Sequence, residues 1–368
     1  MIFIADIHLG KTNDSIDVEG TPSQTVDIRK RLDFIQAIAR MSKQTIVVGG
    51  DIFNRMNPTT QVMSVFFDWL SKCSDNDVPV ILLAGNHDGG VDWTSMFMVA
   101  RISMKGITTV THPSLVEIVE DGFVRVALVI PHVPTNLQEQ AEQGHGSVSK
   151  WVSTTFPKSD FIITHGMIKD SSYSNDIFFE AGNAMTIDPS AFTNLELMLL
   201  GHIHGHIKGK KWAYPGSLTI NNFGEVDEAK GYIEVDLKTL KWNWTAYPES
   251  DITPWVHVEL DFTNKDETSL DESVIKQLVS GAIIKITVLA KAHGVINEAG
   301  IRKLFNKYGY VTRFETVVVT AGNKAVKSDV TLSHDQLLVE YVKGAQEHKE
   351  VKLLALKLGR EIIAGVLE

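Results

Sequence analysis

Aspartate, asparagine and histidine side chains fall in five short clusters along the first 204 residues, and each cluster directly follows an apolar run. Carboxylate oxygens, amide oxygens and imidazole nitrogens are the groups with which proteins hold divalent cations. Five such clusters in order are far less expected by chance than any one of them. The pattern therefore predicts a metal centre built from the ends of several strands. Its nine residues are Asp6 and His8, Asp51, Asn86, His87 and Asp88, His165, and His202 and His204.

The first two clusters have the spacing of metal ligands. Asp6 and His8 stand two residues apart at the end of the first expected strand. Because side chains alternate along a strand, we expect both to face one way and to hold one ion. Asp51 follows the run TIVVGG, where a carboxylate can bridge two metals ~3.5–4 Å apart. Gly49 and Gly50 have no side chains, so we expect them to let a ligand or metal approach the backbone closely.

The later clusters add neutral ligands. Asn86 offers an amide oxygen, which supports a metal without adding negative charge. His202 and His204 stand two apart beside a glycine, which suits metal ligation. Taken singly, these clusters are also typical of a turn or of structural histidines. Within the first 206 residues, four more histidines lie outside the set and are given no role, the last of them interpreted as solvated: His112, His132, His145 and His206.

Composition limits the chemistry. The single cysteine, Cys73, allows no internal disulfide and no thiolate cluster, so we expect an inert thiol and nitrogen and oxygen ligands. The net charge of −10 argues against attraction of the whole molecule to nucleic acid. Two divalent cations would bring four positive charges that this count omits, so a locally positive site is not excluded. No apolar stretch reaches the ~18 residues of a membrane helix and no leader pattern follows Met1, so we expect a cytoplasmic protein without membrane contact.

Periodicity predicts an α/β sandwich up to about residue 248. Apolar residues at helical spacing indicate an amphipathic helix over 26–41, and the polar residues 13–24 indicate a loop over the site. The expected strands are 2–5, 45–48, 78–84, 124–130, 161–164, 197–200, 231–237 and 241–246.

The length of 368 residues predicts two or three domains. The first pattern breaks near residues 248–254, and a smaller α+β pattern follows. We therefore divide the chain into a first domain (1–250), a small α+β domain (251–322) and a linker with two C-terminal helices (323–368). The small domain is expected to contain strands 257–262, 283–289 and 312–319, and helices 271–278 and 297–307.

Read in order, the clusters DIH, GD, GNHD, H and GHIH resemble the metallophosphoesterase superfamily, whose pattern is D-x-H, G-D, G-N-H-D/E, H and G-H-x-H. The resemblance implies a β-sandwich flanked by helices and two divalent ions, with Mn²⁺ favoured and Mg²⁺ or other divalent ions also allowed. It implies that His87 acts on the substrate phosphate or the leaving group and is oriented by Asp88. It assigns Asp6, His8, Asp51 and His204 to one ion, and Asp51, Asn86, His165 and His202 to the other.

Three stretches further resemble the SbcD-type DNA repair nucleases of that superfamily, in their compact bacterial or phage form: ADIHLGK, GDIFNRMNPT, and YPGSLTINNFGEVDEAKGYIEVDL from Tyr214. The resemblance implies an exonuclease on double-stranded DNA ends and an endonuclease on single-stranded DNA, in double-strand break repair or recombination. It also implies that the small domain caps the nuclease domain and binds DNA, and that the C-terminal helices bind an SbcC-like ATPase of the SMC type. The oligomeric state stays open, with a homodimer as one outcome.

Two other functions stay open on the sequence alone. A small-molecule or cyclic-nucleotide phosphodiesterase of the same superfamily would have no use for the region after residue 248. A binding or scaffolding module with an inactive metal site is the other alternative, and the complete ligand set argues against it. Many SbcD-type relatives carry Asp or His where Asn54 stands, which leaves a direct substrate contact by this residue in doubt.

Overall fold

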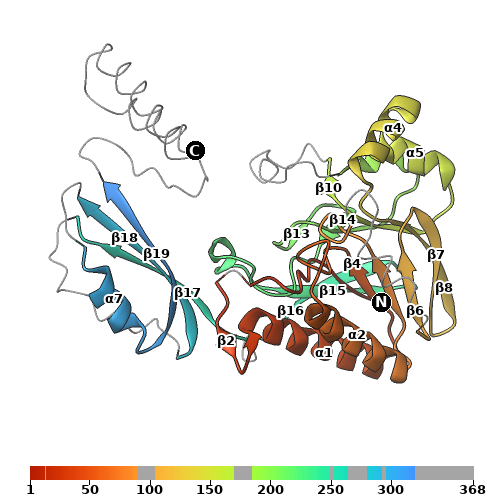
Figure 1. Cartoon of the computed structure of the whole chain (residues 1–368). Helices are drawn as coiled ribbons and strands as arrows, with labels where there is room; N and C mark the ends of the chain where they lie inside the picture. The colour runs from red at the N-terminus through yellow and green to blue at the C-terminus, as the bar shows by residue number, and fades with distance from the viewer. Residues whose placement is uncertain are drawn as a thin grey trace, which may run out of the picture. The chain divides into compact units, whose positions relative to one another are not determined.

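The computed structural model describes residues 1–12, 14–89, 104–169, 185–248, 252–263, 280–291 and 296–319. The chain divides into two compact units. The first unit comprises Met1–Val256 with Gly281–Ile283, and the second comprises His257–Ser280 with Ile284–Glu368. Figure 1 labels the helices and strands.

The first unit is built on two mixed six-stranded sheets. In spatial order, the first sheet consists of β16 (Lys241–Ala246), β15 (Gly231–Asp236), β1 (Ile2–Ile4), β4 (Ile46–Gly49), β5 (Val80–Leu83) and β6 (Ile107–Val110). Strands β1, β4, β5 and β6 run parallel. In the hairpin of β15 and β16, strand β15 pairs antiparallel with β1. The chain segments that follow β1, β4 and β5 therefore lie at one edge of the sheet.

The second sheet has the same mixed character. In spatial order it consists of β13 (Ile207–Lys208), β14 (Trp212–Tyr214), β12 (Met198–Gly201), β9 (Phe161–His165), β8 (Phe123–Ile130) and β7 (Ser114–Glu120). The four central strands run parallel, and the outer two pair antiparallel. Two short pairs lie outside the sheets, β2 (Asp17–Val18) with β3 (Thr21–Pro22) and β10 (Met167–Ile168) with β11 (Thr186–Ile187).

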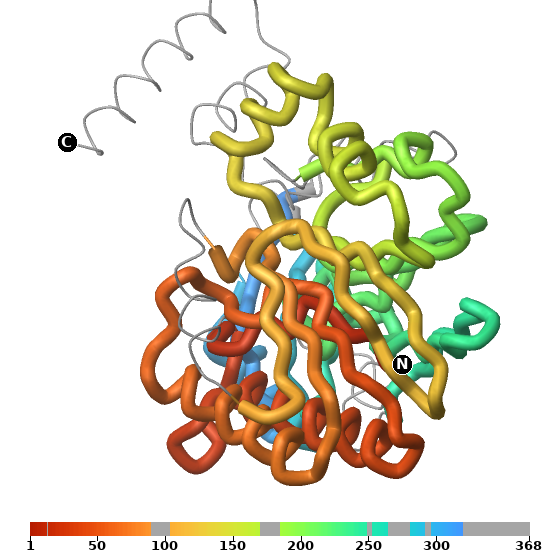
Figure 2. The backbone as a smooth tube through the Cα atoms, turned by 90° about the vertical axis from the view of Figure 1, so that its right-hand side faces the viewer, coloured from red at the N-terminus to blue at the C-terminus, as the bar shows by residue number. Residues whose placement is uncertain are grey.

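Helices cover the outer face of each sheet. Helices α1 (Ser23–Ser42) and α2 (Thr60–Asp75) pack on the first sheet, and α4 (Thr135–His145) and α5 (Val148–Thr155) pack on the second. In Figure 2 the first pair, in red and orange, lies at the bottom and the second pair, in yellow, lies at the top. The side chains of Thr59 and Ser147 accept hydrogen bonds from backbone N–H groups at the starts of α2 and α5, which caps both helices.

The alternation of side chains along the strands sorts the core into layers. Ile2 and Ile4 of β1 pack towards α1 and α2, whereas Phe3 between them packs in the layer between the two sheets. Val47 of β4 and Ile163 of β9 belong to the same layer between the sheets. The first unit is thus a sandwich of helices, sheet, sheet and helices.

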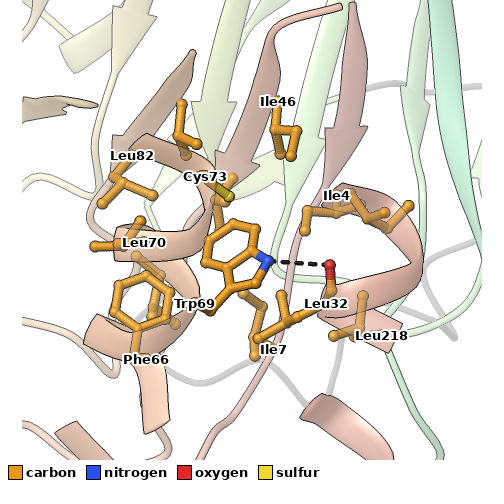
Figure 3. Packing of buried hydrophobic residues seen from close by; sticks show 14 of the residues in the cluster. Ile4, Ile7, Leu32, Ile46, Phe66, Trp69, Leu70, Cys73, Leu82 and Leu218 are labelled. Atoms are coloured by element: carbon orange, nitrogen blue, oxygen red, sulfur yellow. Dashed lines mark hydrogen bonds between the residues drawn. The ribbon is translucent and has the colours of Figure 1, made fainter. Parts of the chain in front are cut away.

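Trp69 anchors α2 to this sandwich. Figure 3 shows its indole among Phe66, Leu70 and Cys73 of the same helix and residues of β1, β4 and β5. The indole Nε1 donates a hydrogen bond to the carbonyl oxygen of Leu32 in α1, at 3.0 Å. Packing and this bond together fix the two helices side by side.

The second unit, as far as the structure describes it, is a three-stranded sheet with one helix. Its strands are β17 (Trp255–Asp261) and β18 (Ala282–Lys291), each without its first two residues, and β19 (Gly309–Val319), and its helix is α7 (Glu298–Phe305). Ile301 and Phe305 of α7 are buried. Lys285 of β18, also buried, forms an ion pair of 2.9 Å with Glu315 of β19.

The predicted α/β sandwich flanked by helices is confirmed. The first helix begins at Ser23 rather than at residue 26, and residues 17–22 hold β2 and β3 where the sequence predicts only a loop. Helices α2, α4 and α5 and, within the two six-stranded sheets, strands β6, β7, β13 and β14 have no counterpart in the prediction. The helix expected over 271–278 and both helices expected in 323–368 lie outside the described residues, so the division into three domains stays a prediction. Within the described part of the chain, no helix is long and apolar enough to cross a membrane.

Candidate metal centre

The five clusters meet where the parallel strands of both sheets end. Because parallel strands share a direction, their carboxyl ends lie at one edge of each sheet. The structure therefore brings all nine predicted residues to one region. The role of seven of them as metal ligands, and the catalytic role of His87 and Asp88, stay predictions. They lie after β1 (Asp6, His8), after β4 (Asp51), after β5 (Asn86, His87, Asp88), at the end of β9 (His165) and after β12 (His202, His204).

Asp51 stands at the centre of the site. Its Oδ2 lies 3.7 Å from His8 Nε2, and its Oδ1 lies 3.4 Å from His165 Nε2. One carboxylate thus faces two sets of donors, which is the arrangement of a bridging ligand. Three sets of side chains have ligand atoms within 4.8 Å of one another: Asp6, His8 and His204, termed here the His204 group; Asp51, His165 and His202, termed the His202 group; and His8, Asp51 and His87, which connects them.

The His202 group is completed by an amide oxygen. Asn86 Oδ1 lies 3.0 Å from both His165 Nε2 and His202 Nδ1. His165 Nδ1 donates to the carbonyl oxygen of Gly49 at 2.8 Å. A carbonyl oxygen only accepts, so Nδ1 carries a proton, and Nε2 is the atom that faces the group and that a metal ion would bind in place of a second proton. Two imidazoles, an amide oxygen and the Asp51 carboxylate form a donor set that fits a divalent cation.

The His204 group has the same kind of donors. The Nε2 atoms of His8 and His204 lie 2.9 Å apart. His204 Nδ1 lies 2.9 Å from Glu225 Oε1 and donates to it, because a carboxylate accepts, so Nε2 is left to face the group. Asp6 is fully buried, and both its oxygens accept from the backbone N–H of His202 at 3.0 Å. Imidazole nitrogens that converge beside a buried carboxylate also fit a divalent cation.

Burial and mutual charge displace the pKa values in the site. Burial raises the pKa of Asp6 to about 7 and lowers the pKa of His202 to about 3. Burial would also raise the pKa of Asp51, but the imidazoles around it, His165 foremost, hold it well below its usual range. In turn, Asp51 outweighs the effect of burial on His165 and raises the pKa of that imidazole to about 9. A bound cation would stabilise the charged form of these buried carboxylates.

The candidate ligands Asp6, His8 and Asp51 have left-handed backbone conformations. Asp6, His8 and Asp51 have φ angles of 54°, 49° and 51°, which are uncommon outside glycine and cluster at functional sites. Their loops are joined by hydrogen bonds from the N–H of Asp6 to the Gly50 oxygen (3.0 Å) and from the N–H of His8 to the Asp51 oxygen (2.9 Å). The alternation of strand side chains is therefore the wrong reason for the common direction of Asp6 and His8. Strand β1 ends at Ile4, before either residue.

The glycines at the site make room for protein side chains. A Cβ on Gly50 would collide with the imidazole of His165, and a Cβ on Gly85 would collide with the carboxylate of Asp51. Gly50 also has a φ of 90°, which side chains other than hydrogen rarely allow. The space left by the missing side chain of Gly50 is taken by His165, and the close approach of a metal to this backbone stays a prediction.

His87 is exposed at the mouth of the site. Its Nδ1 donates to the backbone carbonyl oxygen of Asn54 at 3.0 Å, and its ring centroid lies 4.9 Å from that of His8. The proton on Nδ1 leaves Nε2 as the atom that can act on a substrate. Since Asn54 orients the ring through its backbone, the type of side chain at position 54 does not decide this contact.

Asp88, which was predicted to orient His87, binds backbone N–H groups in the structure. It is fully buried, and its carboxylate accepts hydrogen bonds from the backbone N–H groups of Ile52, Phe53 and Gly85 at 2.8–3.0 Å. Asp88 therefore fastens the loop after β5 to the loop after β4. It holds His87 in place through the backbone and does not orient the ring directly.

Two residues near the site, His206 and His132, differ from their sequence interpretation. His206 is half-buried rather than solvated: its Nδ1 donates to the Tyr214 oxygen at 2.7 Å, and its ring stacks on Trp244 with centroids 4.7 Å apart. His132 is buried, and its ring centroid lies 6.5 Å from that of His165. Burial lowers the pKa of His132 to about 4.

Sequence reasoning also missed the buried pair of Glu225 and Lys230 behind His204. Lys230 Nζ lies 2.8 Å from Glu225 Oε2. Both residues belong to the stretch from Tyr214 that carries the resemblance to SbcD-type nucleases. The resemblance covers the two positions, but only the fold shows that they lie beside His204.

Residues 1–206, which include all nine site residues, match the family model of calcineurin-like phosphoesterases. The chain belongs to this family, and it is a metallophosphoesterase, a hydrolase that acts with metal ions. The predicted superfamily is thus confirmed, while the SbcD type stays a prediction.

Solved structures add only weak likenesses. The crystal structure of TT1561 of Thermus thermophilus has a TM-score of 0.40 and 11% sequence identity, over 67% of this chain and 97% of that chain. A second structure has a TM-score of 0.37 and 12% identity, over 67% and 98% of the two chains.

Proposed function

We propose that the protein is a two-metal-dependent DNA nuclease that acts with an SMC-type ATPase in the repair or recombination of broken DNA. The proposal gives it exonuclease activity on double-stranded ends and endonuclease activity on single strands. One observation carries the hydrolytic part: Asp51 faces two converging donor groups, as a ligand shared by two ions does.

Two divalent ions, when bound, supply a water of lowered pKa and positive charge for the phosphate. The His202 group with Asn86 would hold one ion, and the His204 group with Asp51 the other. The family membership and the pKa shifts of the buried ligands support this use of the site. Mn²⁺ is the proposed ion, and the donor set suits Mg²⁺ less well because imidazoles prefer softer ions.

Residues around the ligands would handle the substrate. The exposed ring of His87 presents Nε2 to the site, where it can contact a phosphate oxygen or protonate a leaving group. Lys11 is half-buried and interacts electrostatically with His8 and His204, so it adds a cation for a substrate phosphate on that side. Local cations are needed because the whole chain carries a charge of −10.

The choice of DNA rests on the stretch from Tyr214 that resembles SbcD-type nucleases. In the structure this stretch lies against the site: the N–H of Ser217 bonds to the His204 oxygen, and Glu225 bonds to the His204 ring. A second folded unit that contributes no ligand among its described residues also supports a large substrate, because duplex DNA needs a surface for its backbone.

A nuclease assay tests the proposal. Linear duplex and circular single-stranded DNA are incubated with the protein and Mn²⁺, beside a chromogenic diester and a cyclic nucleotide. We expect cleavage of both DNAs, its loss with a chelator and in Asp51→Asn, and its retention in the matched control His145→Ala, an exposed histidine of α4. Hydrolysis of the small substrates without any cleavage of DNA would show a small-molecule phosphodiesterase instead, and metal binding without hydrolysis would show a binding module.

The proposed ATPase contact rests on residues 323–368, outside the described part of the chain. Apolar residues recur at helical spacing between 351 and 366, which is typical of a helix that binds a groove of a partner. A chain that ends at residue 328 should keep metal-dependent hydrolysis of a simple diester but no longer co-purify with the ATPase. Binding as tight as that of the full chain would contradict the contact.

A further inference from the structure

Glu225 and Lys230 form a buried ion pair directly behind the ligand His204. Glu225 is 5% exposed and Lys230 is 6% exposed, so both charges lie in the protein interior. Buried charges are retained only where each is paired and hydrogen-bonded. Burying two charges costs free energy, and no step of the proposed hydrolysis uses this pair. We therefore expect the pair to have another role.

Every acceptor position of the Glu225 carboxylate is engaged. Oε1 accepts from His204 Nδ1 at 2.9 Å and from Asn222 Nδ2 at 2.7 Å. Oε2 accepts from Lys230 Nζ at 2.8 Å, from the Asn221 N–H at 3.0 Å and from Ser217 Oγ at 3.3 Å. The carboxylate is therefore fixed in direction, and it fixes the His204 ring with the Nε2 lone pair towards the metal ligands.

The backbone of His204 is held by the same network. Its carbonyl oxygen accepts from the Ser217 N–H at 2.9 Å and from Lys230 Nζ at 3.1 Å. Lys230 thus contacts both the carboxylate behind the ring and the backbone that carries the ring. His204 is held at both ends by residues from a later part of the chain.

The other ligand group is supported differently. The Nδ1 of His165 donates to a neutral backbone oxygen, that of Gly49, at 2.8 Å. A carboxylate acceptor makes an imidazole a stronger electron donor than a carbonyl oxygen does. His204 therefore donates to a negatively charged acceptor, whereas His165 donates to a neutral one.

We propose that Glu225 is a positioning residue for the metal ligand His204, that Lys230 is its counter-charge, and that the pair tunes only the ion held by the His204 group. This inference rests on the metal centre of the proposed function. Five donors surround the carboxylate of Glu225, one of them the ammonium group of Lys230, and this holds the carboxylate as an acceptor for His204 Nδ1. Because Lys230 cancels its charge, Glu225 strengthens the ligand without making the site more negative.

Metal titration of the full chain tests the proposal. Metal-free wild type and Glu225→Gln are titrated with Mn²⁺ by calorimetry, and the visible bands of the Co²⁺-loaded proteins are compared. We expect two ions in wild type and, in the variant, a loss of about 10–100-fold in the affinity of one ion with the other unchanged. Asn86→Ala changes the His202 group, so it should weaken the ion held there and leave the affinity of the other ion unchanged. Glu225→Gln should weaken that other ion, and the Co²⁺ bands of that ion should shift.

Glu228→Gln is the matched control. Glu228 Oε2 lies 3.1 Å from the same Lys230 Nζ, but its side chain is 43% exposed and bonds to Lys230 rather than to His204. This variant should bind both ions as wild type does. The double variant Glu225→Gln/Lys230→Met removes both buried charges and nearly keeps both volumes, so it should fold and show the same selective loss.

Equal weakening of both ions, or unchanged affinity in a folded variant, would overturn the positioning role. The same weakening in Glu228→Gln would overturn it as well, because a general effect of charge would then explain the result. A wild-type chain that binds fewer than two ions would overturn the metal centre itself and this role with it.

Discussion

The tautomer of each histidine follows from what its second nitrogen contacts. His87 donates Nδ1–H to the backbone oxygen of Asn54, so its Nε2 accepts a proton when the ring is neutral and donates one only when the ring is charged. Being exposed and bound to the loop only through Nδ1, the ring contributes little to the packing of the site. Its removal should therefore change turnover and not structure.

We predict that His87→Ala binds two ions and loses about 10²–10⁴-fold in the rate of diester hydrolysis. The measurements are metal stoichiometry by titration and the rate with a chromogenic diester. His145→Ala, a change of an exposed histidine in α4, is the control. Loss of an ion from the variant would make His87 a ligand, and a normal rate would remove it from the reaction.

Glu225 predicts a dependence of stability on acid. Its pKa is lowered from 4.5 to about 2 in the folded protein. An acid with a lowered pKa stabilises the fold above its unfolded pKa, and this contribution is lost as the pH falls towards the folded value. In metal-free protein, the free energy of unfolding of wild type relative to Glu225→Gln should therefore shrink from about pH 5 to about pH 3. Urea unfolding at the two pH values measures it, and a constant difference would show that Glu225 is not an ionised acceptor.

At the scale of elements, the helices of the first layer depend on contacts between them. Trp69 of α2 is 3% exposed and bonds to α1 through the Leu32 oxygen. Trp69→Phe removes that bond and part of the packed volume, so we expect the free energy of unfolding to fall by about 1–3 kcal/mol. Metal affinity should stay unchanged, because α2 supplies no ligand.

Denaturant unfolding and metal titration of Trp69→Phe check this prediction. Met41→Ala, at a position of α1 that is 78% exposed, is the control and should change stability by less than about 0.5 kcal/mol. A loss of metal affinity in Trp69→Phe would mean that α2 supports the site as well as the core.

The strands that carry ligands were predictable from the sequence, because they are short, continuous runs of buried apolar residues. Strands β4, β9 and β12 fall within a residue or two of the expected positions. Helix α2 has a start signal at Thr59 and a buried face with Phe66 and Trp69, so the spacing of its apolar residues could have predicted it. Strand β7 alternates exposed and half-buried residues at a sheet edge, and β13 has two residues, so neither gives a clear pattern.

The candidate ligands could be predicted from the types and order of residues in the sequence. The contacts that hold these ligands in place could not. Asp6 takes a left-handed conformation because its loop bonds to Gly50, a contact that only the fold creates. Glu225 lies 21 residues from His204 in the chain. Asp88 binds backbone amides rather than a ring, and no residue pattern distinguishes these two uses of a carboxylate.

At the scale of the whole molecule, the second unit lets substrate size be tested without deletion. Phe305 of α7 is 1% exposed, so Phe305→Ala should destabilise the second unit by about 3–5 kcal/mol. Since the second unit contributes no described ligand, hydrolysis of a chromogenic diester should continue. If this unit binds DNA as proposed, cleavage of duplex DNA should fall strongly.

The matched control is Tyr308→Ala, a change in the same unit at a residue that is 37% exposed. It should leave both reactions unchanged. Equal losses on the two substrates in Phe305→Ala would instead show that the second unit maintains the site itself.

Each ligand group contains residues from both sheets. In the His204 group, Asp6 and His8 extend from the first sheet and His204 from the second; in the His202 group, Asp51 comes from the first and His165 from the second. A bound ion would thus crosslink the two layers, and separation of the layers would release it. By mass action, an ion at a free concentration of about 100 times its Kd adds about 2.7 kcal/mol to the free energy of unfolding. The melting temperature should therefore rise with each added increment of Mn²⁺ and fall with a chelator, so that thermal melting reports the free metal concentration around the protein.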